Sequence, residues 1–208
     1  MVHLSVIHSA GPAPDADPLE AELVRQIAAG DRASLALLYR RYHRRLVRFL
    51  GRLTRRADII DEAINDAFWV VWQHADRYRG DARVSTWLMG IAYRCALKAL
   101  RVHGAEPVPG AHGDDDDPRT ALDDPFAVHE TNDWVSKGLA RLAPEQRVAI
   151  ELAYGGGHSL EEIAAIVDCP VSTVKARMFY ARVKLRNLLP TLAGARVVAQ
   201  GGTANEHE

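Results

Sequence analysis

The chain has 208 residues, enough for one medium domain or two small ones, and its hydrophobic content is that of an ordinary soluble protein. Its formal net charge of −1 gives no sign of a nucleic-acid partner, but the charges are segregated. Nine arginines and no acidic residue lie between residues 32 and 57, five cations and no acid lie between 171 and 187, and acidic residues dominate 106–133. This asymmetry predicts two basic surfaces for a polyanion and an acidic connector, although any single run could be a solvated helix face.

The cysteines and the apolar runs exclude several classes of protein. Cys95 and Cys169 are the only cysteines, and two isolated cysteines make neither a disulfide framework nor a metal site. We therefore expect no metal and no cofactor. No apolar run approaches the length of a membrane span, and the first residues lack the basic flank and apolar core of an export signal. These observations predict a cytoplasmic protein without membrane insertion.

The first half of the chain predicts a compact helical module over residues 18–102, here called the first module. Residues 1–17 end in a cluster of prolines and are expected to form a flexible leader. From Pro18 onward, apolar residues recur at helical spacing in four successive helices, the third over about 58–74 and the fourth ending near 101. A polar loop over 77–83 precedes the fourth helix, which Ser85 or Thr86 is expected to cap.

An acidic linker and a second helical module follow. Residues 103–132 are rich in Gly, Pro and Asp and lack apolar periodicity, so they cannot offset the entropy cost of ordering. Helical periodicity resumes at Asp133 and continues to about 190, through a helix opened by Pro144 and ended by three glycines. Residues 133–190 are here called the second module, and 191–208 are expected to form a flexible tail. The sequence shows no strand pattern, so the predicted fold class is all-α: two small helical domains joined by a flexible acidic linker.

The sharpest local signal is a predicted helix-turn-helix within the second module. Ser159 and Glu162 form a capping box at the start of one short helix, and Asp168-Cys169-Pro170 predicts a tight turn after it. A basic helix follows, which Ser172 is expected to cap. The second helix of such a motif lies in the DNA major groove. The residues expected to contact bases or phosphates are Ser172, Thr173, Lys175, Arg177 and Arg182. The alternative is a helical hairpin whose cations only keep it soluble.

The first module carries two further groups of candidate residues. Aromatic and cationic residues are mixed in its second half, a combination that suits unpaired bases through stacking and phosphate contacts. The candidates there are Tyr78, Arg79, Asp81, Arg83, Ser85, Thr86, Trp87, Tyr93, Arg94 and Lys98. Trp87 could instead be a core residue, whereas Tyr93 and Arg94 are expected at the surface. Separately, Glu62, Asn65 and Asp66 share one helix face that suits a basic partner, although it could also be only a solvated face.

Several motifs together resemble one family, the extracytoplasmic-function (ECF) sigma factors of bacterial RNA polymerase. The second module carries three of these motifs: Leu142-Ala143-Pro144-Glu145-Gln146-Arg147, Ser159-Leu160-Glu161-Glu162-Ile163-Ala164 and Val171-Ser172-Thr173-Val174-Lys175-Ala176-Arg177. They are similar to region 4 of the family. Three motifs of the first module are similar to region 2: Glu62-Ala63-Ile64-Asn65-Asp66-Ala67-Phe68, Arg79-Gly80-Asp81 and Ser85-Thr86-Trp87-Leu88. The resemblance spans 19–189 with a linker where the family has one.

The resemblance implies a function and a set of partners. It implies that the second module binds the −35 promoter element and docks on the β flap of RNA polymerase. It implies that Glu62, Asn65, Asp66 and Phe68 bind the β′ clamp helices of the core enzyme, while the rest of the first module melts and reads the −10 element. An anti-sigma factor is a further implied partner. The chain departs from the family pattern at Tyr93-Arg94 and Lys98. These departures affect the expected −10 sequence preference more than the expected binding to core polymerase.

Other classes of function remain open at this point. One alternative is a helix-turn-helix regulator that binds duplex DNA without polymerase and would share the second module. Another is a sigma-like decoy that sequesters an inhibitor, although a decoy has no need of a basic recognition helix. An enzyme is disfavoured because the histidines lack ligand or triad spacing. A further hypothesis is that Asp114–Asp117 compete with DNA for the basic surfaces of the free chain.

Overall fold

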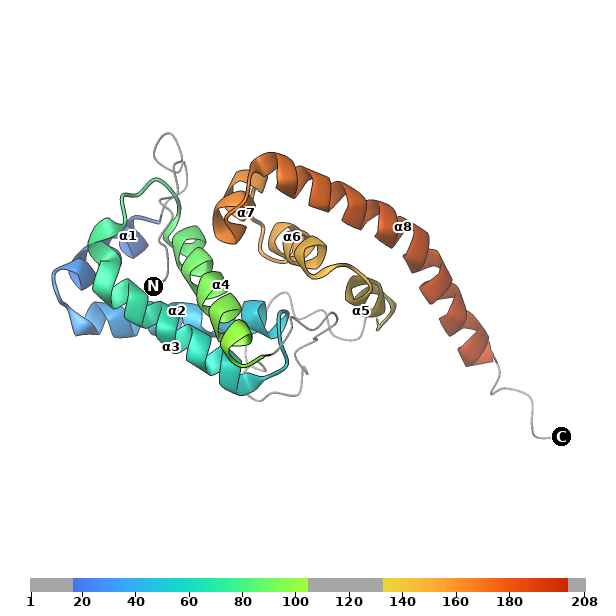
Figure 1. Cartoon of the computed structure of the whole chain (residues 1–208), viewed down its shortest axis with the longest axis horizontal. Coiled ribbons are helices and arrows are strands. Elements are labelled where there is room, and N and C mark those ends of the chain that lie inside the picture. The colour runs from blue at the N-terminus through green and yellow to red at the C-terminus, as the bar shows by residue number, and fades with distance from the viewer. Residues whose placement is uncertain (1–16, 105–132, 202–208) are drawn as a thin grey trace.

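The computed structural model describes residues 17–104 and 133–201, which fold into helices only (Figure 1). The all-α fold class is confirmed, since these two ranges contain no strand. Residues 1–16, 105–132 and 202–208 lie outside the described residues, and with them most of the predicted leader and linker, including Asp114–Asp117. The elements are α1 (Pro18–Ala28), α2 (Arg32–Gly51), α3 (Ala57–His74), η1 (Ala75–Arg77), α4 (Val84–Val102), α5 (Asp133–Ala140), α6 (Pro144–Tyr154), α7 (Leu160–Val167) and α8 (Val171–Gly201).

The first module is a bundle of α1 to α4 around an aliphatic core. Asp17 caps α1 by accepting a hydrogen bond from the Leu19 backbone N–H at 3.0 Å, as acidic N-cap residues do. Inside the bundle, the Tyr42 hydroxyl donates to the Glu20 carboxylate at 2.7 Å, which ties α1 to α2. The leucines and isoleucines predicted on the helical stripes line the core, with Leu46 and Ile64 fully buried. This packing fixes the position of α4, on which most of the predicted base-contacting residues lie.

The fourth helix starts earlier than expected. The predicted cap at Ser85 or Thr86 is wrong, because α4 begins at Val84 and no side chain caps it. Both hydroxyl residues therefore lie inside the first turn, and both are buried. Their burial has a cause outside the first module, described below.

The second module contains the predicted helix-turn-helix, formed by α7 and α8. The capping box is confirmed: the Ser159 hydroxyl accepts from the Glu162 N–H at 3.1 Å, and the Glu162 carboxylate accepts from the Ser159 N–H at 2.9 Å. Asp168 ends α7 in the left-handed conformation, with φ of 52°. That conformation is unusual outside glycine but tolerated by Asp and Asn, and it gives the tight turn that the sequence predicted.

Both ends of α8 differ from the prediction. The helix begins at Val171, and the Pro170 carbonyl accepts from the backbone of Thr173 and Val174, so Ser172 lies in the first turn and does not cap the helix. The helix also continues through Pro190 to Gly201, where a flexible tail was expected from residue 191. The α5 helix packs on α8 near Leu185 and Leu189. Gly138 permits the close approach, since a Cβ there would lie 2.7 Å from the Leu189 side chain.

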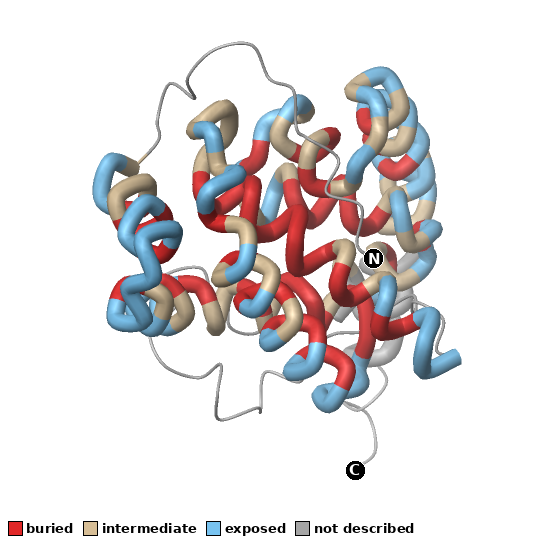
Figure 2. Tube along the Cα trace, turned by 60° about the vertical axis from the view of Figure 1, so that its left-hand side comes forward, coloured by how far each residue is buried: buried red, intermediate tan, exposed pale blue. Residues whose placement is uncertain are grey.

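The two modules pack directly on each other, which the sequence did not predict. Helix α7 lies against α4, and buried residues of both modules belong to one continuous hydrophobic core. Figure 2 shows the buried residues gathered in the middle of the molecule, with exposed residues around them. Gly90 of α4 lies at this contact, because a Cβ at that position would be in van der Waals contact with the Ile166 Cα of α7, at 3.6 Å.

Candidate nucleic-acid and protein interfaces

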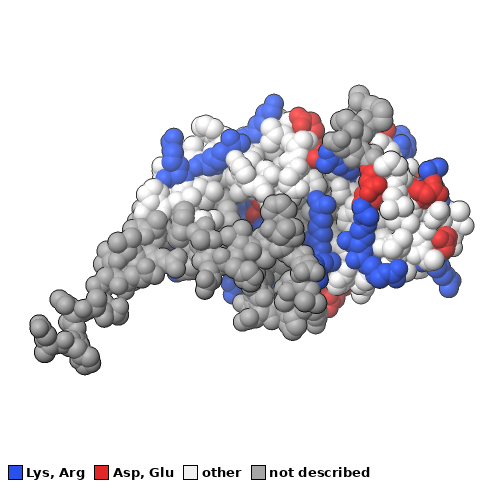
Figure 3. Space-filling view, turned by 180° about the vertical axis from the view of Figure 1, so that it is seen from behind, with Lys and Arg blue, Asp and Glu red and all other residues white. Residues whose placement is uncertain are grey.

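The N-terminal half of α8 presents the predicted DNA-contacting residues at the surface. Ser172, Lys175 and Arg182 are exposed, whereas Thr173 and Arg177 are half-buried. Arg177 is held near the turn, with its Nη1 atom 3.6 Å from the Cys169 Sγ atom. Lys and Arg side chains follow the edge of the molecule that α8 forms (Figure 3). The structure therefore leaves Ser172, Lys175 and Arg182 accessible on α8, while Arg177 lies toward the preceding turn.

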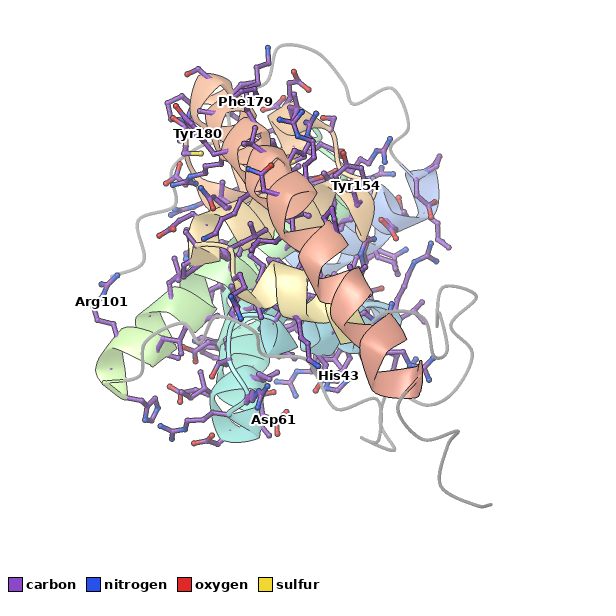
Figure 4. The ribbon with its side chains drawn as sticks, turned by 90° about the vertical axis from the view of Figure 1, so that its right-hand side faces the viewer. His43, Asp61, Arg101, Tyr154, Phe179 and Tyr180 are labelled. Atoms are coloured by element: carbon purple, nitrogen blue, oxygen red, sulfur yellow. The ribbon has the colours of Figure 1, made fainter. Side chains whose placement is uncertain are left out.

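Two exposed aromatic residues extend this edge and were not singled out from the sequence. Phe179 and Tyr180 are each 61% exposed, and their rings meet edge to face with centroids 5.5 Å apart. Figure 4 shows both on α8, at the end of the molecule opposite to Asp61 of α3. Phe179 also lines a shallow hollow with Leu160, Lys175, Arg182, Val183 and Arg186. Both lie off the buried stripe of Val174, Met178 and Ala181, and their exposure identifies them as surface residues.

Four of the ten residues predicted to take unpaired bases are buried in this structure. Ser85, Thr86, Trp87 and Tyr93 are all buried, with Thr86 completely inaccessible. The expectation that Tyr93 lies at the surface is therefore wrong, and Arg94 is likewise only half-exposed. Thr86 is covered because α7 packs on α4 and Glu162 accepts its hydroxyl hydrogen bond, whereas Trp87 packs against Tyr78 of its own module. Burial raises the pKa of the Tyr93 hydroxyl and lowers the pKa of the Arg94 guanidinium, because each charged form is poorly solvated there.

The remaining base-contacting candidates surround this covered face. Tyr78 packs against Trp87 with ring centroids 5.2 Å apart, and its hydroxyl donates to the Ala82 carbonyl at 2.7 Å. Arg79 lies exposed and pairs with Asp81 at 3.2 Å. Lys98 is also exposed, further along α4, with its Nζ atom 3.4 Å from the Asp66 carboxylate on α3. These residues form a rim that stays accessible around the covered face.

Polar contacts between the modules centre on Glu162 and His158. The Thr86 hydroxyl donates to the Glu162 carboxylate at 2.9 Å, and the Arg83 Nε atom lies 3.6 Å from the same oxygen. His158, only 7% exposed, has its Nε2 atom 3.2 Å from the Arg45 guanidinium and its Nδ1 atom 3.7 Å from Glu162. Gly156 leaves room for the ring, since a Cβ there would lie 2.7 Å from it. Arg52 adds a fourth contact, 3.6 Å from buried Glu151 of α6.

These contacts set the protonation of both central groups. Burial lowers the pKa of His158, and the Arg45 charge lowers it further, so the imidazole is held neutral. Burial alone would raise the pKa of Glu162, but hydrogen bonds from the Ser159 backbone and from Thr86 outweigh it and lower that pKa. The carboxylate is thus held ionised against the first module.

The acidic face of α3 is exposed on the side away from α7. Glu62 and Asn65 are exposed and Asp66 is half-exposed, as expected for a face that binds a partner. Phe68 does not belong to it, because its side chain is 5% exposed and packs against Tyr39 with centroids 4.9 Å apart. Its assignment as a polymerase-contacting residue is therefore corrected to a core role. Trp69, which the sequence analysis missed, is 59% exposed and lies one helical turn beyond Asn65 and Asp66.

Other chemical sites are not formed within 17–104 and 133–201. No group of three or more potential metal ligands occurs there. Cys95 is buried in the first module, where burial raises the pKa of its thiol to about 11, and Cys169 is half-buried in the turn before α8. Over the same residues, no helix combines the length and the apolar character that crossing a bilayer would require.

Two family models match the chain in the order that the modules follow. Residues 38–106 match the model described as "Sigma-70 region 2", and residues 133–185 match "Sigma-70, region 4". The first match covers α3, α4 and most of α2, and the second covers α5 to the middle of α8. The exposed α3 face and the covered α4 face thus belong to region 2, and the basic edge belongs to region 4.

Full-length relatives and solved structures agree with these matches. The chain is 35% identical over 170 residues to the ECF RNA polymerase sigma factor SigM of Mycobacterium tuberculosis, an alignment that covers 82% of this chain and 84% of SigM. It is 31% identical over 180 residues to the ECF RNA polymerase sigma-E factor of Escherichia coli K12, covering 82% and 94%.

Two solved complexes have similar folds. CnrH bound to the cytosolic domain of CnrY superimposes with a TM-score of 0.58 at 21% identity, covering 83% of this chain and 98% of that one. The sigma factor RpoE bound to the anti-sigma factor NepR, from Bartonella quintana, gives a TM-score of 0.53 at 25% identity, covering 70% and 89%. With both regions matched and most of its length aligned to such relatives, the chain belongs to the ECF sigma factors of RNA polymerase.

Proposed function

We propose that this chain binds core RNA polymerase and directs promoter-specific initiation, with region 4 reading the −35 element and region 2 melting and reading the −10 element. The observation that carries the proposal is the pairing of two distinct surfaces in one chain. A basic helix-turn-helix edge suits duplex DNA, and an exposed acidic and aromatic face suits a basic protein partner. An isolated regulator needs only the first of these surfaces.

For the −35 element, α8 is the reading helix. Ser172 and Lys175 are at its exposed N-terminal end, which is the part of a recognition helix that reaches base edges. Arg177 and Thr173 flank them, and Arg182 lies two turns further along, where a cation contacts phosphate. Arginine pairs in bidentate fashion with guanine, so Arg177 is the residue best suited to direct base readout.

For the −10 element, the reading face is the start of α4 and the loop before it. Trp87 and Tyr93 supply aromatic faces for stacking, while Arg79, Arg83, Arg94 and Lys98 supply cations for the phosphates of the separated strand. Tyr78, Asp81, Ser85 and Thr86 supply polar edges that a flipped base requires. This role requires α7 to leave α4.

For core polymerase, the contact face on α3 is Glu62, Asn65, Asp66 and Trp69. Glu62 is 2.8 Å from the His103 imidazole and Asp66 is 3.4 Å from the Lys98 ammonium, so both carboxylates already have nitrogen-containing partners within the chain. A partner rich in Arg or Lys would replace those contacts, and the exposed Trp69 ring would supply the apolar centre that interface hot spots have. The implied partner is the β′ clamp helices, with the β flap on region 4.

An anti-sigma factor is proposed as a further partner. RpoE of Bartonella quintana was solved in complex with an anti-sigma factor, and CnrH was solved with the cytosolic domain of CnrY. The hollow beside Phe179 and the neighbouring Tyr180 give region 4 an exposed apolar surface of the kind that protein partners cover. The cell compartment proposed for all these interactions is the cytoplasm.

Run-off transcription with purified core polymerase and genomic fragments tests the proposal. We expect discrete transcripts that appear only when this chain is added, and their 5′ ends identify the promoters. Arg177→Ala should reduce transcript yield from promoters with an intact −35 element, while Arg25→Ala, a cation exposed on α1, serves as the matched control. Specific duplex binding without any binding to core polymerase would instead identify an isolated regulator.

A further inference from the structure

The face of α4 that region 2 would use on melted DNA is covered by α7 of the same chain. Thr86 is fully buried there and donates to Glu162 of α7, and Tyr93 is 9% exposed, while Trp87 is 7% exposed and packs against Tyr78 of region 2. The recognition edge of α8 remains open, with Ser172, Lys175 and Arg182 exposed. Closure of the two modules therefore hides one DNA-binding surface and leaves the other accessible.

The contact is complementary in shape. Gly90 is the α4 residue nearest the α7 backbone, with its ideal Cβ position 3.6 Å from the Ile166 Cα atom. Ile166 is completely buried, and the core cluster is continuous across the junction. A larger residue at position 90 would have to displace either the α7 backbone or the Arg94 guanidinium, which lies 3.4 Å from the same position.

The contact is also complementary in charge. Glu162 points its carboxylate at Thr86 and Arg83, two residues proposed to contact the melted strand. A carboxylate that accepts a hydroxyl hydrogen bond and lies close to a guanidinium uses the donors that a phosphate group would use. Glu162 makes these contacts and still completes the capping box of α7, because its second oxygen accepts from the Ser159 N–H. The carboxylate thus occupies part of the site of the DNA backbone.

We propose that the free chain holds itself closed, with α7 covering the single-strand-binding face of α4 and the Glu162 carboxylate substituting there for DNA phosphate. This proposal rests on the proposed function of region 2. Opening then separates α4 from α7 and frees Thr86, Arg83 and the aromatic residues together. A consequence is that the free chain has access to −35 duplex DNA but not to the unpaired −10 strand.

The test compares Glu162→Gln with Glu161→Gln in the full-length chain. Glutamine at 162 can still accept from Ser159 and from Thr86 but loses the charge facing Arg83. Glu161 is exposed on the same turn of α7, so its substitution removes the same charge without touching α4. Hydrogen–deuterium exchange over residues 84–96 reports closure, and fluorescence anisotropy with a labelled single-stranded thymidine 12-mer reports access to the face.

The expected result is faster exchange over 84–96 and binding of the oligonucleotide at least about threefold tighter for Glu162→Gln, with Glu161→Gln close to the unsubstituted chain. Equal exchange and equal binding in the two variants would overturn the proposal. Faster exchange without tighter binding would also overturn it, since closure would then not limit access to DNA. If no variant binds single strands and the assembled polymerase does not melt promoters either, the proposed function of region 2 fails instead.

A second variant tests closure through shape alone. Gly90→Leu places a side chain against the α7 backbone and is compatible with α4, because leucine favours helix more than glycine does. We expect faster exchange over 160–167 at unchanged helical circular dichroism. Exchange over 160–167 that matches the unsubstituted chain, in a folded Gly90→Leu variant, would contradict the close packing on which the proposal depends.

Discussion

Single exposed side chains on α3 decide how this chain would bind core polymerase. Trp69 stands out because a tryptophan that is 59% exposed contributes little to folding and much to an interface. Trp69→Ala should weaken binding to core polymerase roughly tenfold or more, in keeping with an interface hot spot. The free energy of unfolding should change by less than about 0.5 kcal/mol, as for other surface positions.

Surface-immobilised core polymerase measures the binding, and urea unfolding measures the stability. Val102→Ala is the matched control, since Val102 is 71% exposed on α4 and lies outside the proposed contact face. Equal core affinity for the two variants would remove Trp69 from the interface.

A buried ion pair within α6 gives a prediction about stability at the same scale. Arg147 and Glu151 are 3% and 5% exposed, with the Arg147 Nε atom 2.8 Å from the carboxylate. Glu151→Gln removes the negative charge that faces both Arg147 and Arg52, and the loss of one charge from a buried ion pair costs about 3–5 kcal/mol in comparable pairs. The urea midpoint of region 4 should fall accordingly, whereas Glu145→Gln, on the exposed first turn of the same helix, should leave it nearly unchanged. Similar midpoints for both variants would show that the pair is solvated.

At the scale of elements, local sequence signals predicted the helices well. Asp17 before Pro18, the Ser159–Glu162 capping box and the apolar stripes of α2 and α3 each act through neighbours in the same helix, so the sequence contains the full cause. The caps at Ser85 and Ser172 were predicted wrongly because any hydroxyl near a helix start satisfies the pattern. The actual start depends on which residue leaves the helical conformation first.

The packing of α7 on α4 could not be predicted in the same way. Its determinants, Gly90 and Ile166, are 76 positions apart in the sequence and each satisfies the pattern of its own helix. Tyr93 and Thr86 therefore resembled surface residues, although both are buried. Ser172, Lys175 and Arg182 on α8 and Glu62 and Asn65 on α3 are exposed, because no other described element covers them, whereas Thr173, Arg177 and Asp66 are only partly exposed. Phe68 was assigned to the polymerase contact by the family motif and not by the helix face of Glu62, Asn65 and Asp66, and it is buried.

The contact between α7 and α4 should depend on pH through His158. Burial and Arg45 lower its pKa in the closed chain, and Arg83 acts in the same direction while Glu162 opposes it. Once α7 leaves α4, the pKa returns to its ordinary value of about 6.5. A group with a lowered pKa stabilises the closed form above that value, and this stabilisation is lost as the pH falls below it.

We therefore expect exchange over 84–96 to become faster between about pH 7 and pH 5.5, after correction for the intrinsic exchange rate. Glu162 remains ionised over this range because its own pKa is lowered, so it does not produce the effect. His158→Gln should flatten the pH dependence, whereas His103→Gln, at the far end of α4 beside Glu62, should preserve it. A pH dependence that survives His158→Gln would assign the effect to another group.

For the whole molecule, closure predicts different salt dependences for the free chain and the assembled polymerase. Each phosphate that a protein neutralises steepens the decline of DNA affinity with salt concentration. In the free closed chain Lys175, Arg177 and Arg182 of the α8 edge are available, whereas Arg83 of region 2 lies close to Glu162. Salt also screens the contacts among Arg83, Arg45 and Glu162 that hold α7 in place, which partly offsets the loss of phosphate contacts.

The slope of log affinity against log salt for a fluorescent promoter fork, carrying a −35 duplex and an unpaired −10 strand, should therefore be shallower for the free chain than for the polymerase assembled with it. Substituting Glu162 by Gln should steepen the slope of the free chain by roughly one unit or more, since region 2 cations then reach phosphates. Glu161→Gln should leave the slope unchanged. Identical slopes for the free chain and its Glu162→Gln variant would mean that region 2 contributes its cations whether or not α7 lies on α4.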